Sequence, residues 1–204
     1  MEPLTILFMG PQGSGKGTQL ELLKDFLAKK GASLLATQGE MPVHSIETGK
    51  MFRAFMEGEH FTHRLIRESL GRGERSPDFL ATFLLASWCV ENIAGGEHII
   101  IDGYPRTMPQ ADTFEGVAQF YKRYPVQILS LELDEARAME RLLKRGRHDD
   151  NERGIAERLR WYREKVLPII DLYRKREGYI VHSINAGQSI EDVHRDICAL
   201  LKLT

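Results

Sequence analysis

The sequence of 204 residues has few cysteines, little net charge and no long apolar run. Its two cysteines, Cys89 and Cys198, lack metal-ligand spacing, which argues against a disulfide framework and against a zinc site. A net charge of −1 does not favour binding to nucleic acid or to a membrane surface. The uncharged stretch Phe79–Val90 is only twelve residues long, too short to span a bilayer. No basic signal-peptide region opens the sequence, so we expect a cytoplasmic protein.

The chain contains short apolar runs that alternate with segments of helical periodicity. This alternation predicts one α/β domain built on a parallel sheet, because parallel strands need long crossover connections. Ligands of such sheets collect beyond the carboxyl ends of the strands. The predicted strands are Leu4–Met9, Val43–Ile46, Glu97–Ile101, Val126–Leu133 and Tyr179–Ile184.

The first predicted strand runs into a glycine-rich loop and then into a helical pattern. Gly10, Gly15 and Lys16 have the G-x-x-x-x-G-K spacing of a phosphate-binding loop. Glycine lets backbone N–H groups converge on a phosphate, and the helix N-terminus and the lysine add positive charge. Gly17 follows the lysine, so the hydroxyl comes one place later, at Thr18. A flexible glycine turn is the alternative, but the order strand, loop and helix favours phosphate binding.

The β-branched run Ile99–Ile101 ends in a carboxylate, Asp102. This is the pattern that places an acid near a nucleotide's magnesium ion. Taken by itself, this pattern could also be an aspartate that ends a strand and has no role in magnesium binding.

A stripe of cations follows the fourth predicted strand. Arg137, Arg141 and Arg145 recur every four residues and therefore share one helix face. Like charges on one face repel unless an anion meets them. Asp134 is expected to cap this helix, and Asp149 with Glu152 could form the start of the next one.

Three segments resemble the adenylate kinases, a family of nucleoside-monophosphate (NMP) kinases. They are G-P-Q-G-S-G-K-G-T-Q at 10–19, D-G-Y-P-R-T at 102–107 with Gln110, and R-L-L-K-R at 141–145 followed by G-R-H-D-D at 146–150. The resemblance implies an α/β P-loop NTPase three-layer fold with a central parallel sheet of about five strands. It also implies one domain over 1–204, with a helical NMP-binding insert at about 47–77 and a very short lid at about 145–152.

The resemblance also implies a role for each matching residue. In the family, a threonine contacts the acceptor base, arginines hold phosphates, and a glutamine reads the adenine edge. The expected ATP ligands are Gly13, Ser14, Gly15, Lys16, Gly17, Thr18, Arg141 and Arg147. The expected AMP ligands are Thr48, Arg53, Gly103, Arg106, Gln110 and Arg158. The expected catalytic residues are Lys16, Arg106, Arg145, Arg147 and Arg158. Thr18 and Asp102 are expected to hold Mg²⁺, largely through water.

The sequence departs from the family pattern at a few positions. Tyr104 replaces a phenylalanine, and Glu47 and Lys50 replace the serine and aspartate that flank Thr-Gly. Arg53 could also be a solvated cation on a helix face. His148 is expected to be an exposed lid residue rather than a catalyst.

Outside these motifs the expectations are structural. Ser33–Thr37 could form an extra strand or part of a loop. Ser76 is expected to cap the helix that begins at Pro77, and Ser189 to cap the last helix. Pro168 is expected to bend or limit the lid helix.

The implied activity is reversible transfer of the ATP γ-phosphoryl group to AMP, with Mg²⁺, by a monomer. Two alternatives stay open. The first is a UMP- or CMP-type kinase of the same fold, and the second is a nucleotide-binding sensor with low turnover. A signalling GTPase is poorly supported, because there is no Asn-Lys-x-Asp stretch to read guanine.

Overall fold

The protein is built on a five-stranded sheet in which every neighbouring pair of strands is parallel. The computed structural model describes residues 2–34, 41–72, 74–146 and 150–203. The strand order is β2-β3-β1-β4-β5, so β1 lies at the centre and its neighbours come from later in the chain. The strands are β1 Thr5–Met9, β2 Val43–Glu47, β3 His98–Asp102, β4 Val126–Glu132 and β5 Tyr179–Asn185. The predicted parallel sheet is confirmed, and each strand end lies within one residue of its predicted position.

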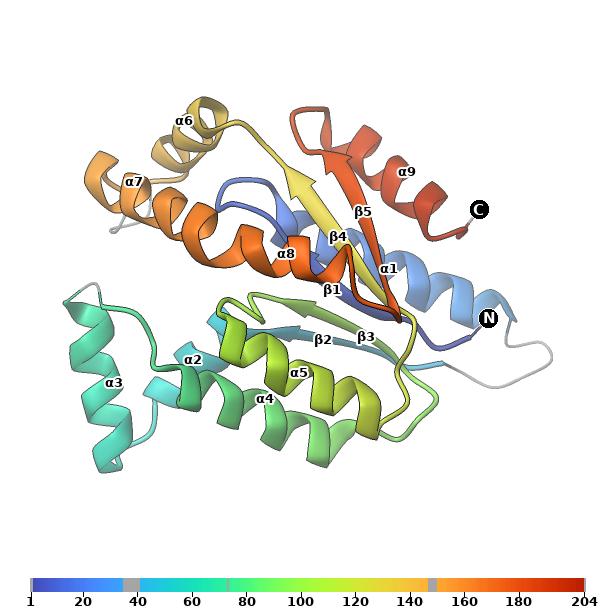
Figure 1. Cartoon of the computed structure of the whole chain (residues 1–204), viewed down its shortest axis with the longest axis horizontal. Coiled ribbons are helices and arrows are strands. Elements are labelled where there is room, and N and C mark those ends of the chain that lie inside the picture. Colours follow the sequence, from blue (N-terminus) through green and yellow to red (C-terminus); the bar gives the residue numbers. More distant parts are fainter. Residues whose placement is uncertain (1, 35–40, 73, 147–149, 204) are drawn as a thin grey trace.

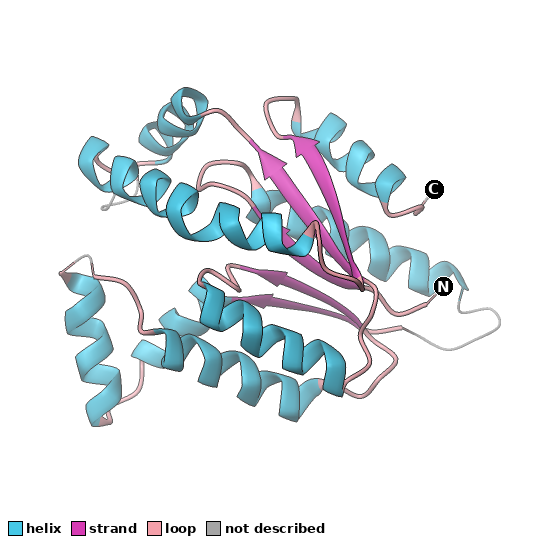
Figure 2. Ribbon diagram, in the orientation of Figure 1, coloured by secondary structure: helices cyan, strands magenta, loops and turns pink. Residues whose placement is uncertain are grey.

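Helices cover both faces of the sheet and give three layers (Figures 1 and 2). Side chains alternate along β1, as a strand buried on both faces requires. Leu7 and Met9 belong to the core beneath α4, α5 and α8, whereas Ile6 and Phe8 belong to the core beneath α1 and α9. The described helices are α1 Lys16–Leu34, α2 Thr48–Met56, α3 Phe61–Gly71, α4 Asp78–Asn92, α5 Met108–Phe120, α6 Glu135–Arg145, α7 Glu152–Trp161, α8 Leu167–Tyr173 and α9 Ile190–Leu200.

The predicted helix caps are confirmed at two places and wrong at a third. Asp134 accepts the backbone N–H of Arg137, and Ser189 accepts that of Asp192. The helix expected to start at Pro77 starts at Asp78 instead, with Pro77 as its N-cap. Asn151 caps α7, because its side chain accepts the Gly154 N–H at 2.8 Å; Asp149, considered for the start of this helix, lies outside the described residues.

The segment after the phosphate-binding loop was only partly predicted. Helix α1 continues to Leu34, so Ser33 and Leu34 are helical and do not begin an extra strand. The rest of the proposed strand, through Thr37, lies outside the described residues.

A π-helical turn, Tyr162–Val166, separates α7 from α8, and Pro168 is the second residue of α8. Pro168 therefore lies where the helical geometry changes.

Two excursions from the sheet frame the candidate site. Helices α2 and α3 follow β2, and α3 lies away from the sheet (Figure 1). Helices α6 and α7 pack on each other through Ala138, Leu142, Ile155 and Leu159. Within 2–34, 41–72, 74–146 and 150–203, none of the helices is long and apolar enough to cross a membrane.

Candidate active site

The loop after β1 has the backbone conformation that its glycines predict. Gly10 and Gly13 have φ of 143° and 86°, values that side chains disfavour. A Cβ at Gly10 would lie 2.5 Å from the carbonyl oxygen of Leu131, and one at Gly13 would lie 3.0 Å from that of Ala138. The loop therefore lies directly against β4 and α6, which leaves no room for side chains at either position.

Lys16 is the first residue of α1 and folds back over this loop. Its Nζ donates to the carbonyl oxygens of Gly10 and Pro11 at 2.9 and 2.8 Å. Ser14 is buried, and its hydroxyl donates to the Pro11 carbonyl at 2.9 Å. Burial lowers the pKa of Lys16; Arg106 and Arg145 act in the same direction, while Asp102 opposes them. A phosphate at this loop would compensate the crowded positive charge.

Asp102 ends β3, opposite Phe8 of β1, and so lies beside the phosphate-binding loop. Its Oδ1 is buried and has no hydrogen-bond partner among the described residues. Thr18 is exposed on the first turn of α1. No group of three or more histidines, cysteines and carboxylates in the described part of the chain could bind a metal by itself. The unpartnered carboxylate oxygen fits Mg²⁺, which usually binds one or two carboxylates and completes its octahedron with waters and phosphates.

The residues predicted to bind the acceptor include Thr48, Gly103 and Arg106, which lie together where β2 and β3 end. Glu47 and Asp102 are paired across these two strands, so the residues that follow them meet. The buried Thr48 hydroxyl donates to the Gly103 carbonyl at 2.9 Å. A Cβ at Gly103, where φ is 84°, would lie 2.3 Å from Thr48 Oγ1 and 2.8 Å from Arg106 Nη2. Glycine is therefore required for the close approach of Arg106.

Gln110 is buried in α5, and its position depends on a residue that the sequence did not single out. Its Oε1 accepts the Arg106 N–H at 2.7 Å, and its Nε2 donates to Asp78 Oδ1 at 2.8 Å. Asp78 Oδ2 also accepts the Thr107 hydroxyl at 2.8 Å. One N–H and one oxygen lone pair of the amide stay available for another partner. Asp78 reads in the sequence only as an acid in the first turn of a helix.

Two of the predicted catalytic arginines share one carboxylate. Arg145 donates from Nε and Nη2 to the two oxygens of Asp150, both at 2.8 Å, and Arg158 Nη2 donates to Asp150 Oδ1 at 2.8 Å. The Asp150 side chain is fully buried. Arg141 Nη1 lies 3.4 Å from the Gly13 carbonyl, above the phosphate-binding loop. Arg147 and His148 lie outside the described residues.

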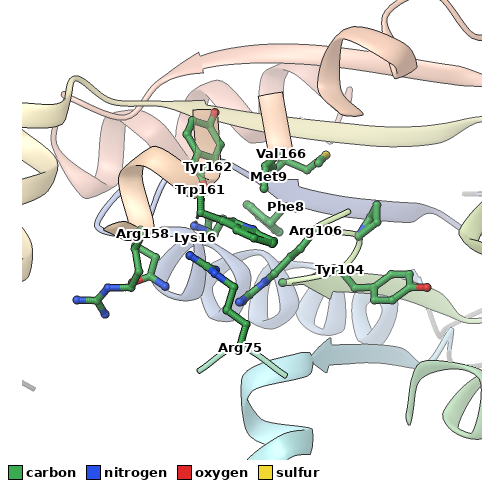
Figure 3. A pocket seen from close by; sticks show the side chains of 14 residues that line it. Phe8, Met9, Lys16, Arg75, Tyr104, Arg106, Arg158, Trp161, Tyr162 and Val166 are labelled. Atoms are coloured by element: carbon green, nitrogen blue, oxygen red, sulfur yellow. Dashed lines mark hydrogen bonds between the residues drawn. The ribbon is translucent and has the colours of Figure 1, made fainter. Parts of the chain in front are cut away.

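A pocket brings the central part of these groups together (Figure 3). Lys16, Arg106 and Arg158 line it, with Gly10 from the loop and Gly103 from the acceptor side. Arg75 and Trp161 also line it, and the sequence motifs indicated neither. Arg53, on α2, is exposed and is not among the lining residues, and neither are Thr48, Asp102, Gln110, Arg141 and Arg145.

The departures from the family pattern have local explanations. Lys50 Nζ lies 2.5 Å from Glu47 and 3.1 Å from Glu21, so the two exchanged charges pair with each other. The hydroxyl of Tyr104 lies 3.1 Å from that of Thr82, so the added polar atom is satisfied in the core.

Comparison with known proteins gives the same picture over most of the chain. The sequence model of the adenylate kinase family matches residues 8–178. The chain is 36% identical over 196 residues to an adenylate kinase of Parasynechococcus marenigrum (strain WH8102), covering 96% of this chain and 97% of that protein. It is 31% identical over 200 residues to an adenylate kinase of Corynebacterium urealyticum, covering 98% of this chain and all of that protein. It is also 35% identical over 188 residues to an adenylate kinase of Prochlorococcus marinus (strain MIT 9303), covering 92% of this chain and 93% of that protein.

Proposed function

Because the chain belongs to the adenylate kinase family, we propose that it transfers the γ-phosphoryl group of ATP reversibly to AMP and so forms two ADP. The observation that carries the proposal is the convergence of Lys16, Arg106 and Arg158 on one pocket between the phosphate-binding loop and the acceptor side. Phosphoryl transfer depends mainly on in-line positioning and on cations around the transferred group.

The reaction needs no protein base. An acceptor phosphate oxygen, already ionised at neutral pH, forms the new bond to the γ-phosphorus. The bond from that phosphorus to the bridging oxygen breaks, and ADP leaves with the electron pair. The task of the protein is therefore to align two anions that repel each other, and its cations lower the cost of that approach.

On the donor side, we assign the triphosphate to the backbone of residues 13–18 and to the Lys16 ammonium. Magnesium would be held by Thr18 and Asp102, largely through water, and would neutralise charge on the phosphates. The orphaned Oδ1 of Asp102 supports this assignment. Arg141 lies above the loop, in reach of the donor nucleotide.

On the acceptor side, Arg106 and Arg158 are assigned to the monophosphate, and Thr48, Gly103 and Gln110 to the base. Arg53 would have to swing in from α2 to join them. Arg145, Arg147 and Arg158 are assigned to the transferred phosphoryl group when the segment at about 145–152 closes. Closure would exclude water and so prevent hydrolysis of ATP.

A coupled ADP-release assay with MgATP tests the proposal, with AMP, UMP, CMP, GMP and dTMP run in parallel. We expect fast turnover with AMP and little with the others. Preference for UMP or CMP would overturn AMP as the acceptor while keeping the chemistry. A folded protein that binds ATP but releases no ADP with any of the five would be a sensor rather than a kinase.

The oligomeric state and the cellular location belong to the same proposal. We expect a monomer, which light scattering after gel filtration would report as a mass near the 23.3 kDa of the chain. We also expect a cytoplasmic location, because the substrates ATP and AMP are abundant there; fractionation of cells that produce the protein would test it.

A further inference from the structure

Arg75 joins the two excursions that frame the site. It lies between α3 and α4, and its guanidinium carbon is 3.8 Å from the centre of the Trp161 ring at the end of α7. In Figure 3 its side chain extends toward that ring, between Arg158 and Arg106. A guanidinium at this distance is attracted by the indole face. The contact links the end of the acceptor-side insert to the helix that carries Arg158.

Among the cations of this pocket, Arg75 and Arg106 have side chains with no acceptor in the part of the chain that the structure describes. Lys16 donates to two carbonyls of its own loop, and Arg158 donates to Asp150 and to the Gly154 carbonyl. Neither Arg75 nor the Arg106 guanidinium makes a hydrogen bond or an ion pair with a described residue. Glu157 attracts Arg75 only at longer range, since it pairs with Arg153 at 3.3 Å.

The surroundings of Arg75 favour an anion. The residues that line the pocket include four cations, Lys16, Arg75, Arg106 and Arg158. No aspartate or glutamate is among these lining residues. Desolvation lowers the pKa of Arg75 to about 10, and repulsion from Arg106 and Arg158 acts in the same direction. Because this pKa is well above 7, the side chain is still charged at neutral pH. Asp150 pairs with Arg158, and Asp102 offsets part of the charge of Lys16 and Arg106, but the four cations outnumber these two carboxylates. The remaining positive charge favours binding of an anion.

The stacking geometry also leaves the correct edge exposed. A guanidinium that stacks through its face keeps its in-plane N–H groups free, and these match two oxygens of a phosphate. The Trp161 indole N–H is buried without an acceptor among the described residues, so no hydrogen bond within that part of the chain fixes the ring. Trp161 is thus an apolar platform that orients a cation.

The position of Arg75 in the chain points to the acceptor rather than to ATP. Three residues later, Asp78 begins α4 and bonds Gln110 and Thr107. Gln110 in turn accepts the Arg106 N–H. The segment that carries Arg75 is therefore fixed to the acceptor side of the site.

We infer that Arg75 is an additional ligand of the acceptor's phosphate, oriented by Trp161 as a positioning residue. The inference rests on the proposed function, which supplies the acceptor. It adds a cation that lies outside the sequence motifs of the phosphate site and predicts that this cation acts on one substrate only.

Equilibrium binding tests this without turnover, by titration of AMP, adenosine and MgATP into wild type, Arg75→Gln and Arg75→Lys. We expect Arg75→Gln to weaken AMP binding about tenfold, the loss of a charge-assisted hydrogen bond. Adenosine has no phosphate and MgATP binds at the other side, so both should bind within about twofold of wild type. Arg75→Lys keeps the charge but loses the paired N–H groups of the guanidinium. Its affinity for AMP should lie between those of wild type and Arg75→Gln.

Arg72→Gln is the matched control, because Arg72 is exposed on the same segment and pairs only with Glu74 among the described residues. It should bind all three ligands like wild type. Trp161→Leu should weaken AMP binding by less than Arg75→Gln does. Trp161→Phe keeps an aromatic face, so it should bind AMP with the affinity of wild type.

Unchanged AMP binding in Arg75→Gln would overturn the inference, as would an equal loss for adenosine or a larger loss for MgATP. The proposed function fails separately, if wild type binds AMP but releases no ADP in the coupled assay. If the coupled assay selects another monophosphate, the titration uses that monophosphate and its nucleoside, with the same criteria.

Discussion

The two sides of the pocket are built differently. The donor side is mostly backbone: Gly10 and Gly13 of the loop lie against β4 and α6, and no side chain could occupy either position. The acceptor side is mostly side chain: guanidiniums reach the pocket from separate elements, Asp150 and Trp161 contact two of them, and Asp78 holds the Gln110 amide. A backbone cradle is fixed by the core beneath it, whereas a set of long cations needs its own partners.

This difference predicts two kinds of mutational response. A change on the donor side should remove binding energy that no neighbour replaces. A change among the acceptor-side partners should leave every cation present but poorly placed, which lowers the rate by a smaller factor.

The largest effect is expected for Lys16→Ala. We expect kcat/KM to fall about 10³-fold, because one full charge next to the transferred group is lost. The fold should persist, since Lys16 bonds only to carbonyls of its own loop within the described part of the chain. ADP release and a thermal melt measure both, with Lys24→Ala, an exposed lysine on the same helix, as the control. Turnover near the wild-type rate would contradict the donor-side assignment.

Arg106→Ala should cost about 10²-fold in kcat/KM for AMP while the apparent affinity for MgATP stays within about threefold. The guanidinium lies close to Gly103, where a Cβ would be only 2.8 Å from its Nη2, and we assign it to the acceptor phosphate. Initial rates with each substrate varied in turn separate the two effects. Equal losses for both substrates would mean that the two sides are not independent.

Asp150→Asn should lower kcat about tenfold, because the amide keeps one oxygen but loses the charge that holds both Arg145 and Arg158. The unfolding midpoint should also fall, since the carboxylate is fully buried beside two cations. Glu140→Gln, which breaks an exposed pair with Lys144 on α6, is the control and should change neither quantity. A wild-type rate in Asp150→Asn would show that the lid arginines are positioned by something else.

Gln110→Ala should raise KM for AMP about tenfold, leave KM for ATP within about twofold and make other monophosphates better competitors. Asp78→Asn should show the same pattern more weakly, because the glutamine remains but loses a charged partner. Asp112→Asn, on the exposed face of α5, serves as the control. Competition by UMP and CMP against AMP is the measurement, and an unchanged ranking would remove Gln110 from base selection.

The same contrast explains what the sequence predicted well. The sheet, the loop and Asp102 follow from local patterns, because a buried strand and a glycine turn are each encoded by neighbouring residues. The roles of Asp78 and Asp150 were not predicted, since Asp78 holds Thr107 and Gln110 at the start of α5 and Asp150 holds an arginine eight positions away. Arg75 and Trp161 are 86 positions apart, and no periodicity relates them. Helix α1 passes through Gly31 and Ser33, where local propensity favoured a break.

The smallest effect is expected where the sequence departs from its family at Glu47 and Lys50. Replacing both with the family residues, Glu47→Ser with Lys50→Asp, should change kcat/KM for AMP by less than about twofold and stability by less than about 0.5 kcal/mol. Lys50 is exposed, Glu47 is half-buried, and their charges offset each other. Neither side chain takes part in the Thr48 hydrogen bond to Gly103. Lys50→Asp alone should do more harm, because it places a third carboxylate beside Glu21 and Glu47. Initial rates and thermal melts of the three proteins test this, and a double variant worse than the single one would show that Glu47 contacts the acceptor.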